Sequence, residues 1–148
     1  MEPQSCCRRA SVKIVVDTNV LVSALIRSEG IPARILNVIL TRQVQVVLDH
    51  RIYAEYQDVL LRPEFGFAPE PVDNLLDFLL QSGERVYTIK TSVALTDPYD
   101  GKFLEVASDG SADFLVTGNL KHFPARQRHG VRVVSPREWW GQWSESKS

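Results

Sequence analysis

The sequence predicts one α/β domain, an α/β/α sandwich with a central parallel sheet. Short runs rich in valine and isoleucine alternate with helical patterns from end to end, and this alternation is typical of a parallel sheet with helices on both faces. The length of 148 residues fits a single domain. A hydrophobic content of 44% and a charged content of 24% are ordinary for a soluble globular protein.

The expected strands are the short apolar runs. Residues 12–16 form an almost continuous run of valine and isoleucine, as buried central strands of parallel sheets do. The other expected strands span residues 44–48, 84–89, 113–117 and 131–134.

Helical spacing and end signals place the helices between these strands. Asp49 and Asp97 are expected N-caps, and Pro98 has the favoured first helical position. Ser135 and Glu138 form a capping box for a short final helix. The other expected helices span about 19–27, 30–41, 50–61, 69–80 and 98–108.

The expected domain covers residues 12–143, between a disordered tail at 1–11 and a short tail at 144–148. The adjacent Cys6 and Cys7 have no other cysteine to pair with, which argues against a disulfide scaffold and for a reducing cytoplasm. No signal peptide or membrane-spanning run is present, so we expect a cytoplasmic protein without a membrane partner. The net charge of −1 excludes a global basic field, so a nucleic acid would need local patches or a bound metal.

Three acidic residues mark the candidate site: Asp17, Glu55 and Asp100. Asp17 directly follows the first strand, and parallel sheets place their sites at the carboxyl ends of the strands. Glu55 borders the apolar face of its helix, and Asp100 shares a face with Phe103 and Leu104. Clustered carboxylates repel each other and are costly to desolvate. A divalent cation would make the cluster favourable, and oxygen ligands suit Mg²⁺ or Mn²⁺.

Asp17 and Glu55 each also have a structural interpretation. Asp17 can be a helix N-cap, although Thr18 or Asn19 can supply the cap and leave Asp17 available. Glu55 can equally be a solvated residue at the flank of its helix.

The later acids and the end of the fourth strand have the same two interpretations. Asp97 and Asp100 resemble a capping box that also suits the helix dipole; the position of Asp100 favours a functional role, and that of Asp97 favours capping. Thr117 and Asn119 are either turn residues or hydrogen-bonding groups at the acidic cluster. Asp113 begins the same strand, so we expect it at the opposite edge of the sheet, in a structural role.

The chain resembles the PIN-domain family, and within it the VapC-like toxins of bacterial and archaeal toxin–antitoxin pairs. The resemblance implies a compact α/β/α fold, metal-dependent endoribonuclease activity with Mg²⁺ or Mn²⁺, a small antitoxin protein as partner, and a homodimer. It rests on residues 14–21 (IVVDTNVL), 53–60 (YAEYQDVL), 97–107 (DPYDGKFLEVA) and 112–119 (ADFLVTGN).

By motif position, Asp17, Glu55 and Asp100 match the first three acids of the family and would bind the metal. Family members often carry a fourth acid after the last inner strand, where this chain has Asn119 and then His122. This departure from the family pattern argues against a second bound metal or a full cleavage rate. Thr117 and Asn119 are implied to position a water or the scissile phosphate, and residues implied to orient the metal ligands are Thr18, Asn19 and Asp97.

Two rival functions are open to the same sequence. The first is a catalytically weak or inactive PIN module that binds RNA or a partner protein, and the departure at Asn119 supports it. The second is a receiver-like phosphoacceptor domain, which fits less well because no pair of adjacent acids precedes Asp17 and because Glu55 has no place in it. Glycine-rich nucleotide loops and a Gly-x-Ser-x-Gly elbow are absent from the sequence.

Overall fold

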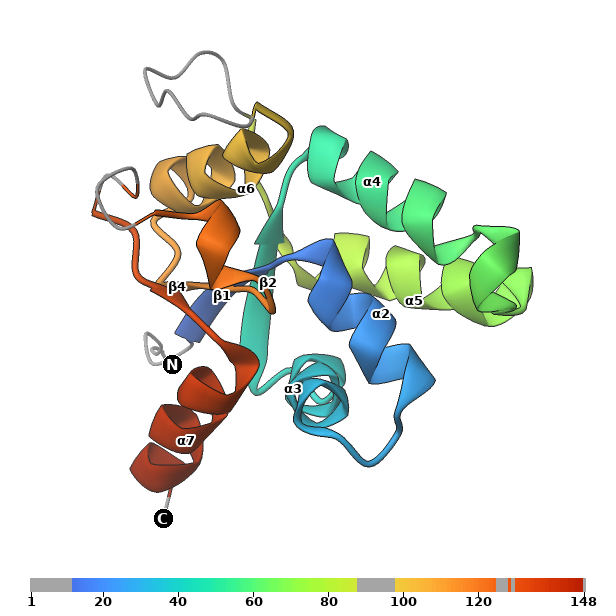
Figure 1. Cartoon of the computed structure of the whole chain (residues 1–148), viewed down its shortest axis with the longest axis horizontal. Coiled ribbons are helices and arrows are strands. Elements are labelled where there is room, and N and C mark those ends of the chain that lie inside the picture. Colours follow the sequence, from blue (N-terminus) through green and yellow to red (C-terminus); the bar gives the residue numbers. More distant parts are fainter. Residues whose placement is uncertain (1–11, 88–97, 125–127, 129, 148) are drawn as a thin grey trace, which may run out of the picture.

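The computed structural model describes residues 12–87, 98–124, 128 and 130–147. The predicted N-terminal tail and Asp97 lie outside this part of the chain, as do the side chains of residues 98–100, 146 and 147. Five parallel strands form one sheet in the order β3-β2-β1-β4-β5, with β1 at its centre (Figure 1). The strands are β1 (Val12–Val16), β2 (Val44–Leu48), β3 (Glu84–Arg85), β4 (Phe114–Val116) and β5 (Val133–Val134).

The three inner strands match the prediction closely, whereas the two edge strands are shorter than expected. β3 and β5 contain two residues each, against the expected 84–89 and 131–134. Both are edge strands with a neighbour on one side only. Their length is therefore set by the hydrogen bonds to that single neighbour and not by the length of the apolar run. The predicted residues 88 and 89 lie outside the described part of the chain.

The helices fall where helical spacing predicts them, and the end signals at Asp49 and at Ser135 with Glu138 are confirmed. Asp49 Oδ1 accepts a hydrogen bond from the Ile52 amide at 2.9 Å, and Ser135 and Glu138 exchange the two bonds of a capping box at 3.1 Å. The final helix is longer than expected, because it continues past residue 143 to Lys147. The helices are α2 (Thr18–Ile26), α3 (Ile31–Leu40), α4 (His50–Leu60), α5 (Pro69–Ser82), α6 (Pro98–Asp109) and α7 (Pro136–Lys147), with short 3₁₀ turns η1 (Pro63–Phe65) and η2 (Leu120–His122).

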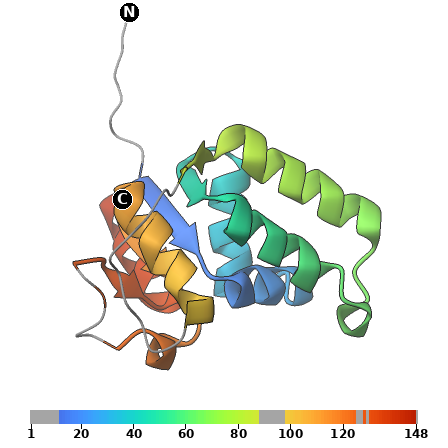
Figure 2. The same ribbon diagram turned by 90° about the horizontal axis from the view of Figure 1, so that it is seen from above.

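Helices cover both faces of the sheet, which confirms the predicted α/β/α sandwich. In Figure 1, α6 lies above the strands, and α3 and α7 lie below them and contact each other. Figure 2 shows α4 and α5 side by side, joined by the η1 turn at the end away from the strands. The strand residues Ile14, Val15 and Val16 are at most 1% exposed, so β1 runs through the centre of the core.

The two edges of the sheet carry different sets of polar residues. At the amino edge, the amide of Lys13 donates to Asp113 Oδ2 at 2.8 Å, and the Asp113 amide donates to the Lys13 carbonyl at 2.7 Å. Asp113 therefore lies at the edge opposite to Asp17, as predicted. None of the helices in the described ranges combines the length and the apolar character that crossing a membrane requires.

Candidate active site

The register of the sheet brings Asp17 and Thr117 together at the carboxyl edge. Val16 of β1 pairs with Val116 of β4, so the residues that follow them are neighbours. The Thr117 hydroxyl donates to Asp17 Oδ2 at 2.8 Å. Asp17 occupies the N-cap position of α2, but its side chain makes no capping hydrogen bond. The Thr117 hydroxyl therefore joins the carboxylate to the end of β4, while the backbone amides of Thr18 and Asn19, at the start of α2, also lower the pKa of Asp17.

Asp17 is a buried acid in an environment that disfavours its charged form. Its exposure is 6%, and Thr117 is fully buried. Burial raises the pKa of Asp17 above its ordinary value, and the nearby charge of Glu55 raises it further, while the hydrogen bond from Thr117 acts in the opposite direction. A cation beside Asp17 would offset the free-energy cost of its buried negative charge.

Glu55, on α4, is held by a hydroxyl on one side and by a cation on the other. The Thr18 hydroxyl donates to Glu55 Oε2, and Lys102 Nζ of α6 forms an ion pair with Glu55 Oε1 at 2.5 Å. The side chains of Lys102 and Glu55 are 10% and 9% exposed, so this ion pair is largely buried. It neutralises one of the two carboxylates within the protein itself.

Lys102 is the site residue that the sequence analysis missed. It stands between Gly101 and Phe103, in a segment where both neighbours are buried. A lysine among core residues, two positions after a candidate acid, is the signal that would have identified it. Buried lysines are rare unless they are paired, and the nearby acids offered a partner.

Tyr56 fixes α4 against the end of β1. Its hydroxyl donates to the Val16 carbonyl at 2.6 Å, and the residue is fully buried. Burial raises the pKa of Tyr56 well above its ordinary value, with a further contribution from the charges of Asp17 and Glu55, so the phenol stays protonated and keeps donating. Since Glu55 directly precedes Tyr56, this contact brings the Glu55 side chain to the edge where Asp17 lies.

A pocket of about 350 Å³ opens over these groups. His122 is exposed and belongs to its lining. The amide nitrogen of Asn119 lies 3.0 Å from His122 Nε2, and the Asn119 backbone amide donates to the Thr117 hydroxyl at 3.0 Å. The residues lining this pocket, which we call the acidic pocket, are Asp17, Thr18, Asn19, Val22, Ser23, Glu55, Val59, Phe65 and His122.

The structure brings two of the three predicted metal ligands together. Asp100 is placed in the first turn of α6, two residues before the Lys102 that contacts Glu55, but its side chain lies outside the described part. Its contact with the acidic pocket therefore stays a prediction. Asp97 lies outside the described residues altogether.

The donors of the acidic pocket fit a hydrated Mg²⁺ or Mn²⁺. Carboxylate and hydroxyl oxygens are the hard ligands that these ions prefer, and Mg²⁺ usually keeps several waters. Within the residues that the structure describes, no three His, Cys, Asp or Glu side chains gather as a metal-binding group, and the side chain of Asp100, the third predicted ligand, is not among them. The fit rests on Asp17, whose buried carboxylate forms no ion pair among the described residues, and on Glu55 beside it.

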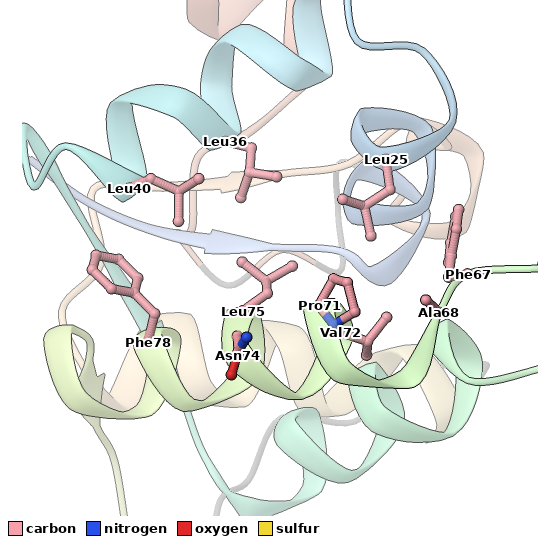
Figure 3. A pocket seen from close by; sticks show the side chains of 10 residues that line it. All are labelled: Leu25, Leu36, Leu40, Phe67, Ala68, Pro71, Val72, Asn74, Leu75 and Phe78. Carbon is pink, nitrogen blue, oxygen red and sulfur yellow. The ribbon is translucent and has the colours of Figure 1, made fainter.

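A second cavity, of about 510 Å³, is apolar and has no catalytic groups. Figure 3 shows side chains of α2, α3 and α5 facing one another across it. Asn74 is the polar residue among those that line it. The chemistry of the site therefore belongs to the acidic pocket.

Comparison with known proteins agrees with this architecture. The family described as "PIN domain" matches residues 13–121. The chain is 28% identical over 142 residues to the uncharacterized protein MJ1680 of Methanocaldococcus jannaschii, a match that covers 88% of this chain and 91% of that protein.

Two solved structures are similar in fold. One is VapBC2 from Rickettsia felis bound to a DNA fragment from their promoter, at 15% identity and a TM-score of 0.56. The other is DNA-bound VapBC from Salmonella typhimurium, at 17% identity and a TM-score of 0.57. Each similarity covers 84% of this chain and 98% of the other chain. At these identities the similarity is one of fold.

Proposed function

The chain belongs to the PIN domain family, and from this premise we propose that it is a metal-dependent endoribonuclease, the toxin of a prokaryotic toxin–antitoxin pair. PIN domains are generally nucleases. The observation that carries the proposal is the buried Asp17 carboxylate, which shares the acidic pocket with Glu55 at the carboxyl edge of the sheet.

Asp17, Glu55 and Asp100 would hold Mg²⁺ or Mn²⁺. The ion, when bound, activates a water for attack and offsets the charge that develops on a phosphodiester. In the proposed reaction the water oxygen would lose a proton to solvent and bond to phosphorus. The bond from phosphorus to the leaving oxygen would break, and that oxygen would keep the electron pair and take up a proton from solvent.

Thr117 orients Asp17 for this role. Its oxygen accepts from the Asn119 amide at 3.0 Å, so its own proton is directed to Asp17 Oδ2 at 2.8 Å. This bond favours the ionised form of Asp17 and fixes the direction of the carboxylate. Thr18 does the same for Glu55. Asn119 and His122, at the rim, are the groups that would hold the scissile phosphate or a water.

Lys102 lowers the cost of the site before metal binds. Two carboxylates in one pocket repel, and Lys102 balances the charge on Glu55. It also leaves Asp17 as the carboxylate that most needs a cation. Lys102 is therefore a positioning residue for Glu55 in this proposal, and it favours one bound metal over two.

A toxin nuclease would damage its own host, so we propose a small antitoxin as partner and the cytoplasm as location. The two structural neighbours are VapBC assemblies, which supports an antitoxin partner. A homodimer is proposed on family grounds. Expression in a bacterial host with and without the gene directly upstream tests the pairing, and equal growth in both cases would contradict it.

The alternative function is a catalytically weak PIN module that binds RNA or a partner protein. Lys102 favours this alternative, because it already neutralises one predicted metal ligand. Asn119 and His122 favour it as well, since they stand where family members often carry a fourth acid.

A cleavage assay with a binding control separates the two functions. Purified full-length protein is incubated with labelled single-stranded RNA in Mn²⁺, in Mg²⁺ and in EDTA, and RNA binding is measured in parallel. The proposed function predicts cleavage with either metal and none in EDTA. Intact RNA under all conditions, with binding unaffected by metal, would instead identify the non-cleaving module.

A further inference from the structure

A groove of about 770 Å³ adjoins the acidic pocket. It lies between the end of α2, the start of α3, the turn after β4 and the start of α7. Ser23 lines both hollows. The Gly118 amide donates to Asn19 Oδ1 at 3.1 Å, which connects a residue lining the groove to one lining the acidic pocket. An RNA strand that leaves the acidic pocket past Ser23 and Gly118 would therefore enter this groove.

Three exposed arginines line the groove: Arg27, Arg34 and Arg137. Glu29 is the acid among the lining residues, so the groove carries an excess of positive charge. No ion pair joins these three arginines to an acid in the described ranges, in contrast with Arg51, which pairs with Asp49 and Glu105. The three guanidinium groups are thus available to an external anion.

The positive charge of the groove is local. The whole chain has a formal net charge of −1, and the adjoining pocket is acidic. The cluster of arginines is therefore not a consequence of a generally basic surface. Guanidinium groups are suited to phosphate, which they bind with paired hydrogen bonds. Three of them beside a site for phosphodiester cleavage match a row of backbone phosphates better than a single small anion.

We propose that this groove, defined by Arg27, Arg34 and Arg137, binds the phosphate backbone of the RNA strand on one side of the scissile bond. The inference rests on the proposed nuclease function and adds to it the surface that holds the substrate. Contacts to phosphate position a strand without reading its sequence. The groove therefore sets affinity and register, while the acidic pocket cleaves.

The test compares two sets of arginines in the full-length protein. The groove variant carries Arg27→Gln, Arg34→Gln and Arg137→Gln. The matched control carries Arg42→Gln, Arg85→Gln and Arg132→Gln, which remove the same charge from exposed arginines outside both hollows. Each set is also introduced with Asp17→Asn, so that binding of single-stranded RNA can be measured in EDTA without cleavage.

In the binding experiment, we expect the groove variant to lose about tenfold or more in affinity. The slope of log affinity against log salt should become shallower by about 2, since each phosphate contact contributes about 0.7 for a single strand. The control should stay within about twofold in affinity. Equal affinity and slope in both variants would overturn the inference, and so would an absence of RNA binding by the protein with its arginines intact.

In the cleavage experiment, a dinucleoside monophosphate (the dinucleotide) contains the scissile phosphate and no further backbone phosphate for the groove arginines to bind. We expect the groove variant to lose about tenfold in kcat/KM on a longer RNA and to match the control on the dinucleotide. Equal loss on both substrates would overturn the inference, because it would show a disturbed acidic pocket. If the triple variant melts early, the three single variants replace it, each with about a third of the change in salt slope.

These outcomes are distinct from failure of the proposed function. A protein that binds RNA through the groove but cleaves none of it would contradict the nuclease and support the groove. A groove variant that loses capture of an acidic antitoxin segment, while binding RNA as the control does, would assign the arginines to a protein partner and overturn the inference.

Discussion

The two edges of the sheet carry aspartates in contrasting environments. Asp17, at the carboxyl edge, is 6% exposed, and its carboxylate is held by the Thr117 side chain. Asp113, at the amino edge, is exposed and accepts from the Lys13 amide. Asp17 is buried and forms no ion pair among the described residues. Asp113 is exposed to solvent and joins its strand to β1 by hydrogen bonds. Burial, and not residue type, separates the candidate site from the scaffold.

Each edge also carries a lysine–glutamate pair. Lys102 and Glu55 are 10% and 9% exposed, and Lys13 and Glu84 are 28% and 38% exposed, at N–O distances of 2.5 and 2.9 Å. The same two residue types thus form a buried pair at one edge and a partly solvated pair at the other. Parallel substitutions at the two edges therefore test whether the carboxyl edge forms a functional site.

The largest expected effect on stability is at the lysines. Lys102→Met should lower the free energy of unfolding by about 3–5 kcal/mol, because it leaves the Glu55 charge buried and uncompensated. Lys13→Met should cost at most about 1 kcal/mol, as exposed pairs do. Urea unfolding in EDTA measures both. Equal losses at the two lysines would show that the Glu55 pair is no more buried in solution than the Glu84 pair.

Metal should stabilise the protein through the carboxyl edge. Mn²⁺ at a hundred times its Kd should add about 2.7 kcal/mol to the free energy of unfolding, and the melting temperature should rise accordingly. Asp17→Asn should abolish most of this gain and Asp113→Asn should leave it intact. Identical melting temperatures in millimolar Mn²⁺ and in EDTA for the unsubstituted protein would rule out the metal site.

Without metal, Asp17→Asn should stabilise the protein. The pKa of Asp17 is raised by burial above 3.8, its value in an unfolded chain, so its ionised form costs stability at neutral pH. The gain from the substitution should be full above the raised pKa, decrease as the pH falls through it, and vanish below pH 3.8. Melting temperatures in EDTA across this range test the sign, and a loss of stability at pH 7 would contradict it.

The smallest effect is expected at Asn119. Its amide contacts His122, and the added charge of Asn119→Asp would lie at the rim of the acidic pocket. Mn²⁺ affinity should rise and the melting temperature in EDTA should fall, each by an amount equivalent to about 1 kcal/mol or less. Calorimetry and thermal melts measure the two quantities. No change in either would leave Asn119 as a turn residue.

The fold and the position of Asp17 beside Thr117 were predictable from the sequence, because both follow from local patterns. Alternating elements predict a parallel sheet, and the carboxyl ends of parallel strands lie at one edge, which places Asp17 beside Thr117 and away from Asp113. The register of β1 against β4 then confirms the pairing. The lengths of the edge strands were wrong, because they depend on which strands lie outermost.

The other positions in the candidate site depend on how the helices pack against the sheet and against each other. The spacing of apolar residues in the sequence does not show this packing. The helical pattern placed Glu55 only at the flank of its apolar face. Its position at the site comes from the hydrogen bond between Tyr56 and Val16, a contact between α4 and β1. The pairing of Lys102 with Glu55 likewise requires α6 to pack near α4, so its partner was not evident from the sequence.

The most direct test of the account is RNA cleavage by Asp17→Asn and Asp113→Asn, measured side by side in Mn²⁺ with EDTA controls. Loss of a metal ligand removes several kcal/mol of transition-state stabilisation, and about 1.4 kcal/mol is tenfold in rate. We expect a loss of about a hundredfold or more for Asp17→Asn and a change of less than about threefold for Asp113→Asn. Full activity in Asp17→Asn, with loss in Asp113→Asn, would place the site at the other edge of the sheet.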